Sequence, residues 1–346
     1  MHNRAIGFLI LYGSAMLVAF VFPPAGVWGF LFESNYHPPF NRWWGRAIMS
    51  LGDRWSFYIG AVMVLAVLLN WSRYQAVPFW KHTQSKLLIL FSINACVVTV
   101  FAYDMDASWN EMVDNLKWLL VYFCIIKTHS DRRWLPVILY IYIFAAIDAG
   151  WQTTFDPKSG RFVRGGPVTA SVDENFVASH MIALLPMVAF YAFSPNIERW
   201  LRAICLLGAP LMLNVVAHAQ SRGAFLALAA AGAVLPLVAK GRLRGIAIVV
   251  LLLGALASAR LFHQQFWDRM GTIETYQEDG SAEGRIAAWK DAWDLSLQNP
   301  FGYGGEAFDR GLKRVSKTTH NMYFECLVAW GFQGTLIWLG FIGVTC

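Results

Sequence analysis

Long apolar runs alternate with short polar segments along most of the 346-residue chain. Ten of these runs are long enough, or nearly so, to cross the roughly 30 Å hydrocarbon core of a bilayer as helices. They fall near residues 5–22, 56–71, 86–103, 113–126, 134–151, 175–193, 202–217, 223–239, 245–262 and 322–345. The pattern predicts an all-α fold, a polytopic transmembrane bundle of about ten spans that forms a single domain over residues 1–346.

The segments around the first and last runs also carry information. The first run is interpreted as a span, because Pro23 and Pro24 follow it and no small-residue cleavage site of a signal peptide does. Residues 23–55 hold four tryptophans among prolines and arginines, which predicts an interfacial segment anchored at the lipid headgroups. The last run reaches the end of the sequence without a polar tail, as expected for part of a longer protein.

Composition agrees with this pattern. The chain is 57% hydrophobic and 14% charged, whereas charged residues make up about a quarter of a soluble domain. The formal net charge of +6 does not indicate nucleic-acid binding, because Lys and Arg flank membrane helices for topological reasons. All five cysteines fall in apolar runs without CxxC spacing, which predicts buried thiols and neither a disulfide framework nor a metal site.

Charge predicts the orientation of the loops. Short loops with most of the basic clusters lie at 72–85, 127–133, 194–201 and 240–244. The opposite side carries an acidic loop at 104–111 and the two longest polar segments, 152–174 and 263–321. By the positive-inside rule the basic loops are cytoplasmic. We therefore predict a large, partly helical extracytoplasmic loop at 263–321 that caps the site.

Three basic residues on that outer side are candidates for chemistry. Arg222 follows Ser221, a natural N-cap, at the start of a predicted helix. A helix N-terminus with an arginine in its first turn favours a phosphate. The alternative is that Arg222 only extends its charged end to the headgroups.

Arg285 opens the second candidate segment, a short amphipathic helix that Asn299 and Pro300 end. Its apolar positions recur every three or four residues, at Ile286, Trp289, Trp293 and Leu297. Such a helix is expected to lie on the membrane surface or to cover a cavity. The third candidate, His320, stands just before the last apolar run, where an isolated interfacial histidine is the alternative interpretation.

Several motifs together resemble a known family. They are S-R-G-A at 221–224, G-R-I-A-A-W and N-P-F-G-Y-G within 284–304, H-N-M-Y and G-F-Q-G within 320–334, and the loop at 164–178. In this order they are similar to the O-antigen ligase and Wzy-type polymerase superfamily. The sequence departs from that pattern in two ways: members usually have more than ten spans, and Ala329 stands where they often have an acidic residue.

The resemblance implies a polytopic glycosyltransferase of the bacterial inner membrane whose active site faces the periplasm. Its donor would be a glycan on a polyprenyl diphosphate carrier such as undecaprenyl diphosphate, in lipopolysaccharide or other cell-envelope polysaccharide biosynthesis. The acceptor would be a glycan, a lipid or a protein. A repeat-unit polymerase with the same site is an alternative, and a lipid-linked oligosaccharide transporter is an alternative from another class.

The residues suit this chemistry. Arginine forks hold phosphate oxygens, so Arg222 and Arg285 are predicted to bind the diphosphate. A histidine with a pKa near neutral can take the acceptor proton, which predicts His320 as the base or as the group that orients the acceptor, with Arg285 as the second catalytic residue. Secondary contacts are predicted for Arg164, Asn175 and Asn321.

A metal mechanism is the chemical rival. Asp104 and Asp106 form a D-x-D sequence on the outer side, a pattern that some sugar transferases use to hold Mn²⁺ or Mg²⁺. In a short loop with further carboxylates, a solvated acidic loop is the preferred interpretation. We therefore predict no catalytic metal and no cofactor.

Overall fold

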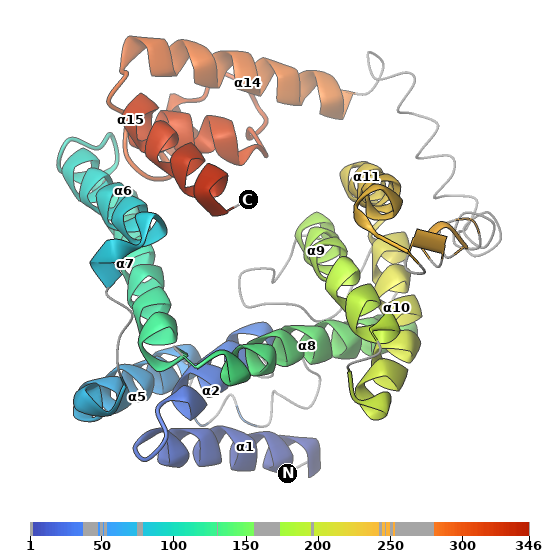
Figure 1. The fold of residues 1–346 in the computed structure, drawn as a ribbon. Helices are drawn as coiled ribbons and strands as arrows, with labels where there is room; N and C mark the ends of the chain where they lie inside the picture. The colour runs from blue at the N-terminus through green and yellow to red at the C-terminus, as the bar shows by residue number, and fades with distance from the viewer. Residues whose placement is uncertain are drawn as a thin grey trace. The chain divides into compact units, whose positions relative to one another are not determined.

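The computed structural model describes the chain over residues 3–36, 54–74, 79–129, 131–155, 174–194, 197–241 and 280–345, with isolated residues at 48, 51, 244–245, 247–249 and 252. Throughout these ranges the regular structure is helical, without strands (Figure 1). The all-α prediction is therefore confirmed. The helices group into two compact units, residues 1–69 with 131–273 and residues 70–130 with 274–346.

The first unit begins with three helices: α1 (Asn3–Ala19), α2 (Pro24–Tyr36) and α5 (Trp55–Leu69). Proline suits the first position of α2, where its missing N–H is not needed. Val27 and Leu31 of α2 are buried, and the helix contacts α1, α5 and α8. The expected headgroup segment at 23–55 is thus, over its first third, a packed helix, because small and branched residues let its neighbours approach closely.

Four further helices complete the described part of this unit: α8 (Leu135–Phe155), α9 (Glu174–Phe193), α10 (Arg199–Ala219) and α11 (Arg222–Val238). A Cβ at Gly150 would lie 2.6 Å from the Leu211 backbone, and Gly208 is equally close to Ile147. These contacts show that α8 and α10 run parallel. Helix α9 runs antiparallel to α10, because the Arg202 side chain near the start of α10 donates to Ala192 O near the end of α9. The N-terminus of α9 therefore lies at the end where α8 and α10 finish, and α11 begins directly after α10 at that same end.

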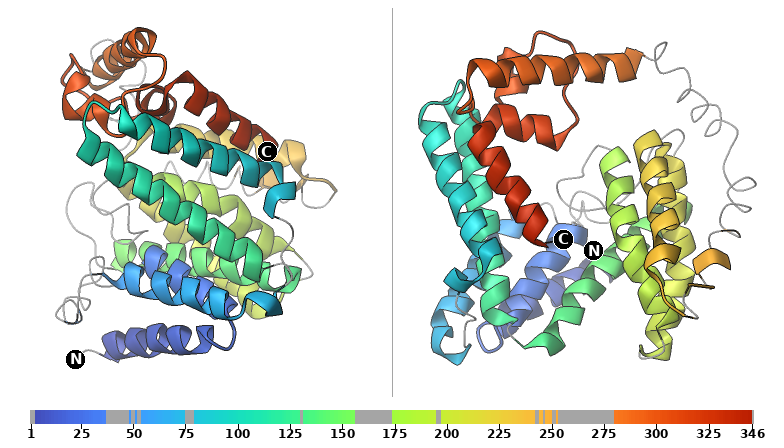
Figure 2. Two further views of the ribbon diagram at one scale, coloured as in Figure 1. Left: turned by 90° about the vertical axis from the view of Figure 1, so that its left-hand side faces the viewer. Right: turned by 45° about the horizontal axis from the view of Figure 1, so that its top comes forward.

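The second unit contains α6 (Thr83–Val100), α7 (Met105–Thr128), α14 (Gly280–Gln298) and α15 (Met322–Thr345), with the short helical turns η1 (Trp71–Arg73), η2 (Phe79–Lys81) and η5 (Phe308–Leu312). The η3 turn (Arg132–Trp134) belongs to the first unit. In Figure 2, α6 and α7 lie side by side as antiparallel neighbours. Hydroxyl contacts join both ends of this pair: Thr99 to Ser108 at 2.8 Å and Ser85 to Tyr122 at 3.2 Å.

All but one of the predicted apolar runs overlap a helix; the run at 245–262 lies mostly outside the described residues. Of the described helices, α6, α8, α9, α10 and α15 are long and apolar enough to cross a membrane. The helices α1, α5 and α11 are apolar but shorter. Five candidate spans support a multi-pass membrane protein, and the number ten stays a prediction.

Candidate functional site

The last candidate span, α15, is interrupted where the N-P-F-G-Y-G segment of the sequence meets it. Helix α15 breaks at Gly331, which has φ 73° and ψ −178°. Three backbone hydrogen bonds join the break to the N-P-F-G-Y-G segment: Tyr303 N–H to Val328 O (2.8 Å), Gly304 N–H to Ala329 O (2.9 Å) and Phe332 N–H to Pro300 O (3.0 Å). They satisfy backbone groups that a helix end leaves unpaired. Two motifs separated in the sequence, residues 300–304 and 328–332, thus form one structural element, called here the joint.

Side chains and a glycine complete this joint. Carboxamide groups bond to its carbonyls: Asn299 to Gly302 O (2.8 Å), Gln333 to Phe301 O (2.8 Å) and Asn94 to Trp330 O (3.0 Å). Gly302 has φ 96°, and a Cβ there would lie 2.6 Å from both Ala329 O and Gly331 N. Only glycine combines this backbone conformation with so close an approach.

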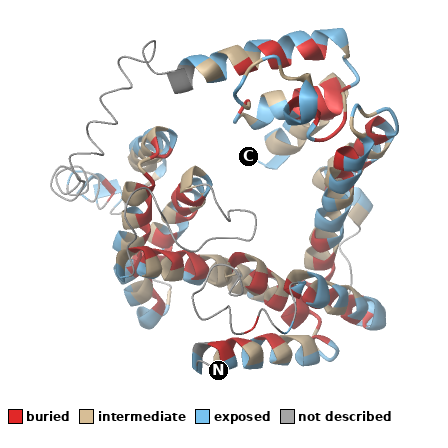
Figure 3. Cartoon of the chain, turned by 180° about the vertical axis from the view of Figure 1, so that it is seen from behind, coloured by how far each residue is buried: buried red, intermediate tan, exposed pale blue. Residues whose placement is uncertain are grey.

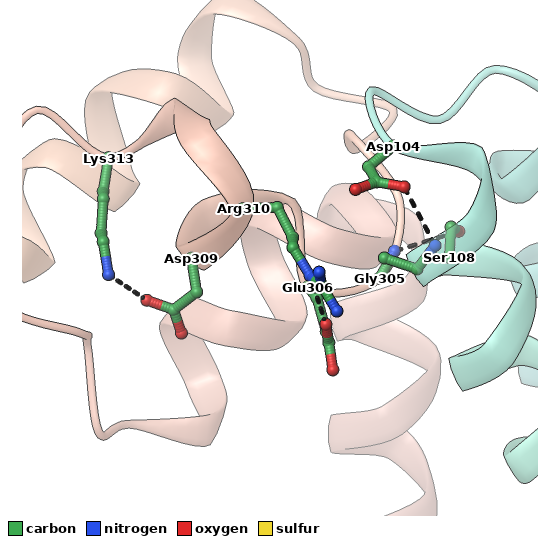
Figure 4. A network of polar contacts seen from close by, with 8 residues as sticks. Asp104, Ser108, Gly305, Glu306, Asp309, Arg310 and Lys313 are labelled. Atoms are coloured by element: carbon green, nitrogen blue, oxygen red, sulfur yellow. Dashed lines mark hydrogen bonds and ion pairs between the residues drawn. The ribbon is translucent and has the colours of Figure 1, made fainter.

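The same loop continues to the start of α7 (Figure 4). Ser108 Oγ accepts the Gly305 N–H at 3.1 Å, and Tyr103 N–H donates to Tyr303 O at 2.8 Å. Asp104 caps α7, because its carboxylate accepts the Ala107 N–H at 3.0 Å. One carboxylate of the D-x-D sequence therefore already has a structural partner, and no group of three or more metal-ligating side chains occurs within the described residues.

His320 stands in a strained position beside this joint. Its φ is 44°, and its side chain is exposed. The preceding Thr319 is fully buried; its carbonyl accepts the Trp289 indole N–H at 2.8 Å and its hydroxyl donates to Glu325 Oε1 at 2.7 Å. Asn321 begins α15, where its side-chain oxygen accepts the Tyr323 N–H at 3.0 Å. Thr319 and Asn321 thus fix the backbone on both sides of the histidine.

Arg285 lies one turn before Trp289 on α14, so the two residues share a helix face. Its side chain is exposed. A Cβ at Gly284 would lie 2.8 Å from Cγ of Lys317, which brings the first turns of α14 against the 317–320 segment. Arg285, Lys317 and His320, here called the basic patch, therefore gather in one part of the second unit. No local pattern around Lys317 marked this residue beyond its charge.

Helix α14 carries both buried and exposed residues (Figure 3). Ala288, Ala292 and Leu295 are buried and pack with Phe308 and Val328. Ile286, Trp293 and Leu297 of the stripe are 38%, 46% and 56% exposed. The small residues allow α14 to approach α15 closely. Trp289 and Trp293 of the stripe also contact α15, through its rings Phe324 and Phe332, so the stripe is only partly turned away from the packed face. That the stripe lies on a membrane surface stays a prediction.

Arg222 and Asn175 belong to the first unit. Ser221 is the N-cap of α11, as predicted, since its hydroxyl accepts the Ala224 N–H at 3.3 Å. Arg222, half-buried, is the first residue of α11, and Asn175 is in the first turn of α9, at the same end of the unit. Arg164 lies outside the described residues. Joint action of Arg222 with Arg285 and His320 stays a prediction.

Sequence reasoning missed a cavity within the second unit. It has a volume of about 940 Å³ and is lined by α6, α7, residues 306–309 and α15. Glu111, outside the predicted span at 113–126, is one of its lining residues. Burial and the neighbouring carboxylates Glu306, Glu325 and Asp114 raise the pKa of Glu111 to about 7. No local pattern marked these residues, because they come from three separate segments.

Comparison with known proteins adds one match. The family model described as O-Antigen ligase matches residues 207–339. No curated protein and no solved structure matches the chain. The matched region contains Arg222, Arg285 and His320, together with the loop and the broken helix α15. Residues 207–339 thus match the O-antigen ligase family, as the motif order predicts, and the described apolar helices are those of a multi-pass membrane protein.

Proposed function

We propose that this protein transfers a glycan from a polyprenyl diphosphate carrier to an acceptor hydroxyl on the extracytoplasmic face of a bacterial inner membrane. The O-antigen ligase match supports a ligase-like glycosyltransferase with lipid-linked glycan and acceptor as partners. The apolar helices support a site at a membrane surface. The donor, the acceptor and the orientation are part of the proposal.

The reaction needs two kinds of help from the protein. The bond between the sugar C1 and the diphosphate oxygen breaks, the acceptor oxygen bonds to C1, and the acceptor proton leaves to a base. Arg285 and Arg222 hold the departing diphosphate through charge-assisted hydrogen bonds. His320 takes the acceptor proton. Asn321, Asn175 and Arg164 are proposed as secondary contacts.

The observation that carries this proposal is the way Thr319 holds His320. An L residue at positive φ costs free energy and persists only where its surroundings enforce it. Here the Trp289 indole and the Glu325 carboxylate fix Thr319 at 2.8 and 2.7 Å. Because Trp289 belongs to the helix that carries Arg285, one contact orients the proposed base relative to the proposed phosphate-binding residue.

The test compares Thr319→Val with a matched variant. Valine keeps the shape of threonine but loses the hydrogen bond to Glu325, so His320 becomes less well placed. We expect single-turnover transfer to fall on the order of tenfold, while the affinity for the donor is unchanged. Thr345→Val is the control, since the Thr345 hydroxyl bonds only to Phe341 O within its own helix. Equal transfer rates for both variants would contradict the positioning role.

Metal independence is a separate part of the proposal. Activity in purified membranes is expected to persist in excess chelator. It should also survive Asp104→Asn combined with Asp106→Asn, apart from a modest loss of helix capping at Asp104. Loss of turnover on chelation, with recovery on adding Mn²⁺ or Mg²⁺, would overturn it.

One observation favours a transporter as the second candidate: α15 is discontinuous at Gly331, and broken helices form substrate sites in many transporters. Here, however, the 300–304 segment already pairs with the backbone at the break. A fluorescent lipid-linked oligosaccharide in proteoliposomes separates the two functions. Movement of the probe across the bilayer without transfer would favour transport.

Orientation can be tested by reporter fusions. The basic cluster at Lys240 and Arg244 predicts that a reporter at residue 242 is cytoplasmic, and the long outer loop predicts that one at residue 278 is not. Inverted labelling would remove the proposed site from the compartment where such ligation takes place.

A further inference from the structure

The cavity of the second unit has an unusual combination of lining groups. Its carboxylates come from α7, from residues 306–309 and from α15: Glu111, Asp114, Glu306, Asp309 and Glu325. Aromatic rings line the same space: Phe91, Trp118, Phe308, Trp330, Trp338 and Phe341. A volume of about 940 Å³ is of the size that small-molecule ligands occupy. The cavity, called here the acidic cavity, lies wholly within this unit.

Three of the carboxylates have basic partners. The pairs are Glu306 with Arg310 (2.8 Å), Asp309 with Lys313 (2.9 Å) and Asp114 with Lys117 (2.8 Å) (Figure 4 shows the first two). Among the described residues, Glu111 and Glu325 have no ion pair. Glu325 instead accepts the Thr319 hydroxyl, and the Glu111 carboxylate packs against Gly305. Glu325 and, when it is ionised, Glu111 therefore give the cavity its excess negative charge.

Glu111 is held firmly at the wall. A Cβ at Gly305 would collide with its carboxylate, so the glycine leaves just enough room for that side chain. The raised pKa of Glu111, about 7, reflects burial together with Glu306, Glu325 and Asp114. An additional anion such as a phosphate would increase this repulsion. A neutral or cationic group would not.

The chemistry of the lining fits a sugar ring. Carboxylates are hydrogen-bond acceptors, which suits donation from ring hydroxyls. Aromatic faces bury the apolar C–H faces of a ring and form favourable contacts with a cationic amino group. The basic patch has the opposite charge and suits a diphosphate. Within one unit, donor and acceptor chemistry are thus assigned to different surfaces.

We propose that the acidic cavity binds the reacting end of the acceptor, an uncharged or amino sugar without phosphate, with Glu111 and Glu325 binding its hydroxyl or amino groups. This assignment rests on the proposed glycan transfer. Geometry connects the cavity to that reaction, because the Glu325 carboxylate in its wall is hydrogen-bonded to Thr319, the neighbour of His320. An acceptor held by Glu325 is therefore beside the segment that carries the proposed base.

The test measures sugar binding without any donor present. The full chain in nanodiscs is probed by saturation-transfer NMR with methyl β-glucoside, methyl β-galactoside and methyl β-glucosaminide. Methyl glucuronide and glucose 6-phosphate are the anionic counterparts. We expect binding of at least one neutral or amino probe and affinities on the order of tenfold lower for the anionic probes.

Variants connect binding to the cavity. Glu111→Gln and Glu325→Gln should each lower the affinity for the bound probe on the order of tenfold, because a charged acceptor is lost. Asp106→Asn is the matched control, since Asp106 is exposed on α7 and does not line the cavity. Absence of binding for all neutral and amino probes, equal binding of the anionic probes, or no effect of either glutamate variant would overturn the proposal.

A second measurement separates this proposal from glycan transfer itself. Binding of a polyprenyl diphosphate to wild type and to Arg285→Ala reports on the donor site alone. If the diphosphate depends on Arg285 but no glycoside depends on Glu111, the cavity assignment is wrong while the proposed function stands. If glycosides bind as expected but diphosphate binding does not depend on Arg285, the donor assignment fails instead.

Discussion

The basic patch and the acidic cavity are two regions of one unit with opposite chemistry. Arg285 and His320 are exposed, on a helix end and on a strained turn. Glu111 is half-buried against a glycine, among aromatic side chains. The contrast indicates how one small unit can handle an anionic donor and a hydroxyl-rich acceptor without mixing them. If both proposals hold, charge sorts the donor from the acceptor before the proposed catalytic residues act.

The two regions meet at a single residue. Thr319 receives the Trp289 indole from the side of α14 and donates to Glu325 on the cavity side. His320 follows it directly and is therefore oriented by both regions. If the basic patch binds the donor and the acidic cavity binds the acceptor, variants in the basic patch should change donor binding or chemistry. Variants in the cavity should change acceptor binding.

The largest expected effect is that of His320→Ala, which removes the proposed base. Single-turnover transfer should fall by a factor on the order of 10² to 10⁴, while donor affinity is retained because the base acts on the acceptor. His320→Asn is the companion variant, because asparagine tolerates positive φ and preserves the backbone. Transfer near the wild-type rate in either variant would show that His320 has only a structural role.

Arg285→Lys tests the other half of the basic patch. Lysine keeps the charge but loses the bidentate fork, so turnover should fall by a factor on the order of 10 to 10³. Arg222→Ala should instead weaken donor binding, because its proposed contact exists in the ground state as well. Arg133→Lys, an exposed residue paired with Asp131, is the control. Wild-type turnover in Arg285→Lys would argue against direct phosphate contact.

The sequence alone predicted those features of the fold and of the candidate site that depend on local pattern. Apolar run length predicted the helices, and Ser221 before Arg222 predicted the start of α11. Motif order predicted the family. Local pattern did not predict the break at Gly331, because that break depends on backbone pairing with a loop some thirty residues earlier.

Packing between helices explains the other differences between the predicted and the observed structure. Periodicity marked the large apolar side chains of α14, whereas the close approach of α15 also buries the small residues Ala288 and Ala292. The acidic cavity was missed for a related reason. Glu111, Glu306 and Glu325 are far apart in the sequence, and each resembles an ordinary surface carboxylate when considered alone.

The pairing of the N-P-F-G-Y-G loop with the break in α15 can be tested through Gly302→Ala. The added Cβ would meet Ala329 O and Gly331 N at 2.6 Å, at a φ of 96° that alanine rarely adopts. A stability loss of about 2–4 kcal/mol is expected from strain and overpacking together. Thermal unfolding in nanodiscs should rank it well below Gly343→Ala, where no atom lies within 4 Å of the new Cβ. Equal unfolding temperatures would contradict the described joint.

The smallest expected effect concerns the pH dependence of stability at the acidic cavity. The pKa of Glu111 is raised from 4.5 to about 7, so the folded state holds more protons than the unfolded state between these values. Stability from this group is therefore fully present below about pH 4.5 and is lost as the pH rises through about 7. The carboxylates that face Glu111 are Asp114 from α7, Glu306 from the loop and Glu325 from α15.

Glu111→Gln removes this titration while preserving the shape of the side chain. Unfolding temperatures in nanodiscs, measured from pH 5 to 8.5, should fall more steeply with pH for wild type than for the variant. The variant should be the more stable protein at the alkaline end, because it lacks the repulsion with Glu306 and Glu325. Asp106→Asn should follow the wild-type slope, since Asp106 is exposed and outside the cavity. Parallel curves for wild type and Glu111→Gln would show that the carboxylates do not converge on Glu111, and the contrast between the two regions would then rest on the basic patch alone.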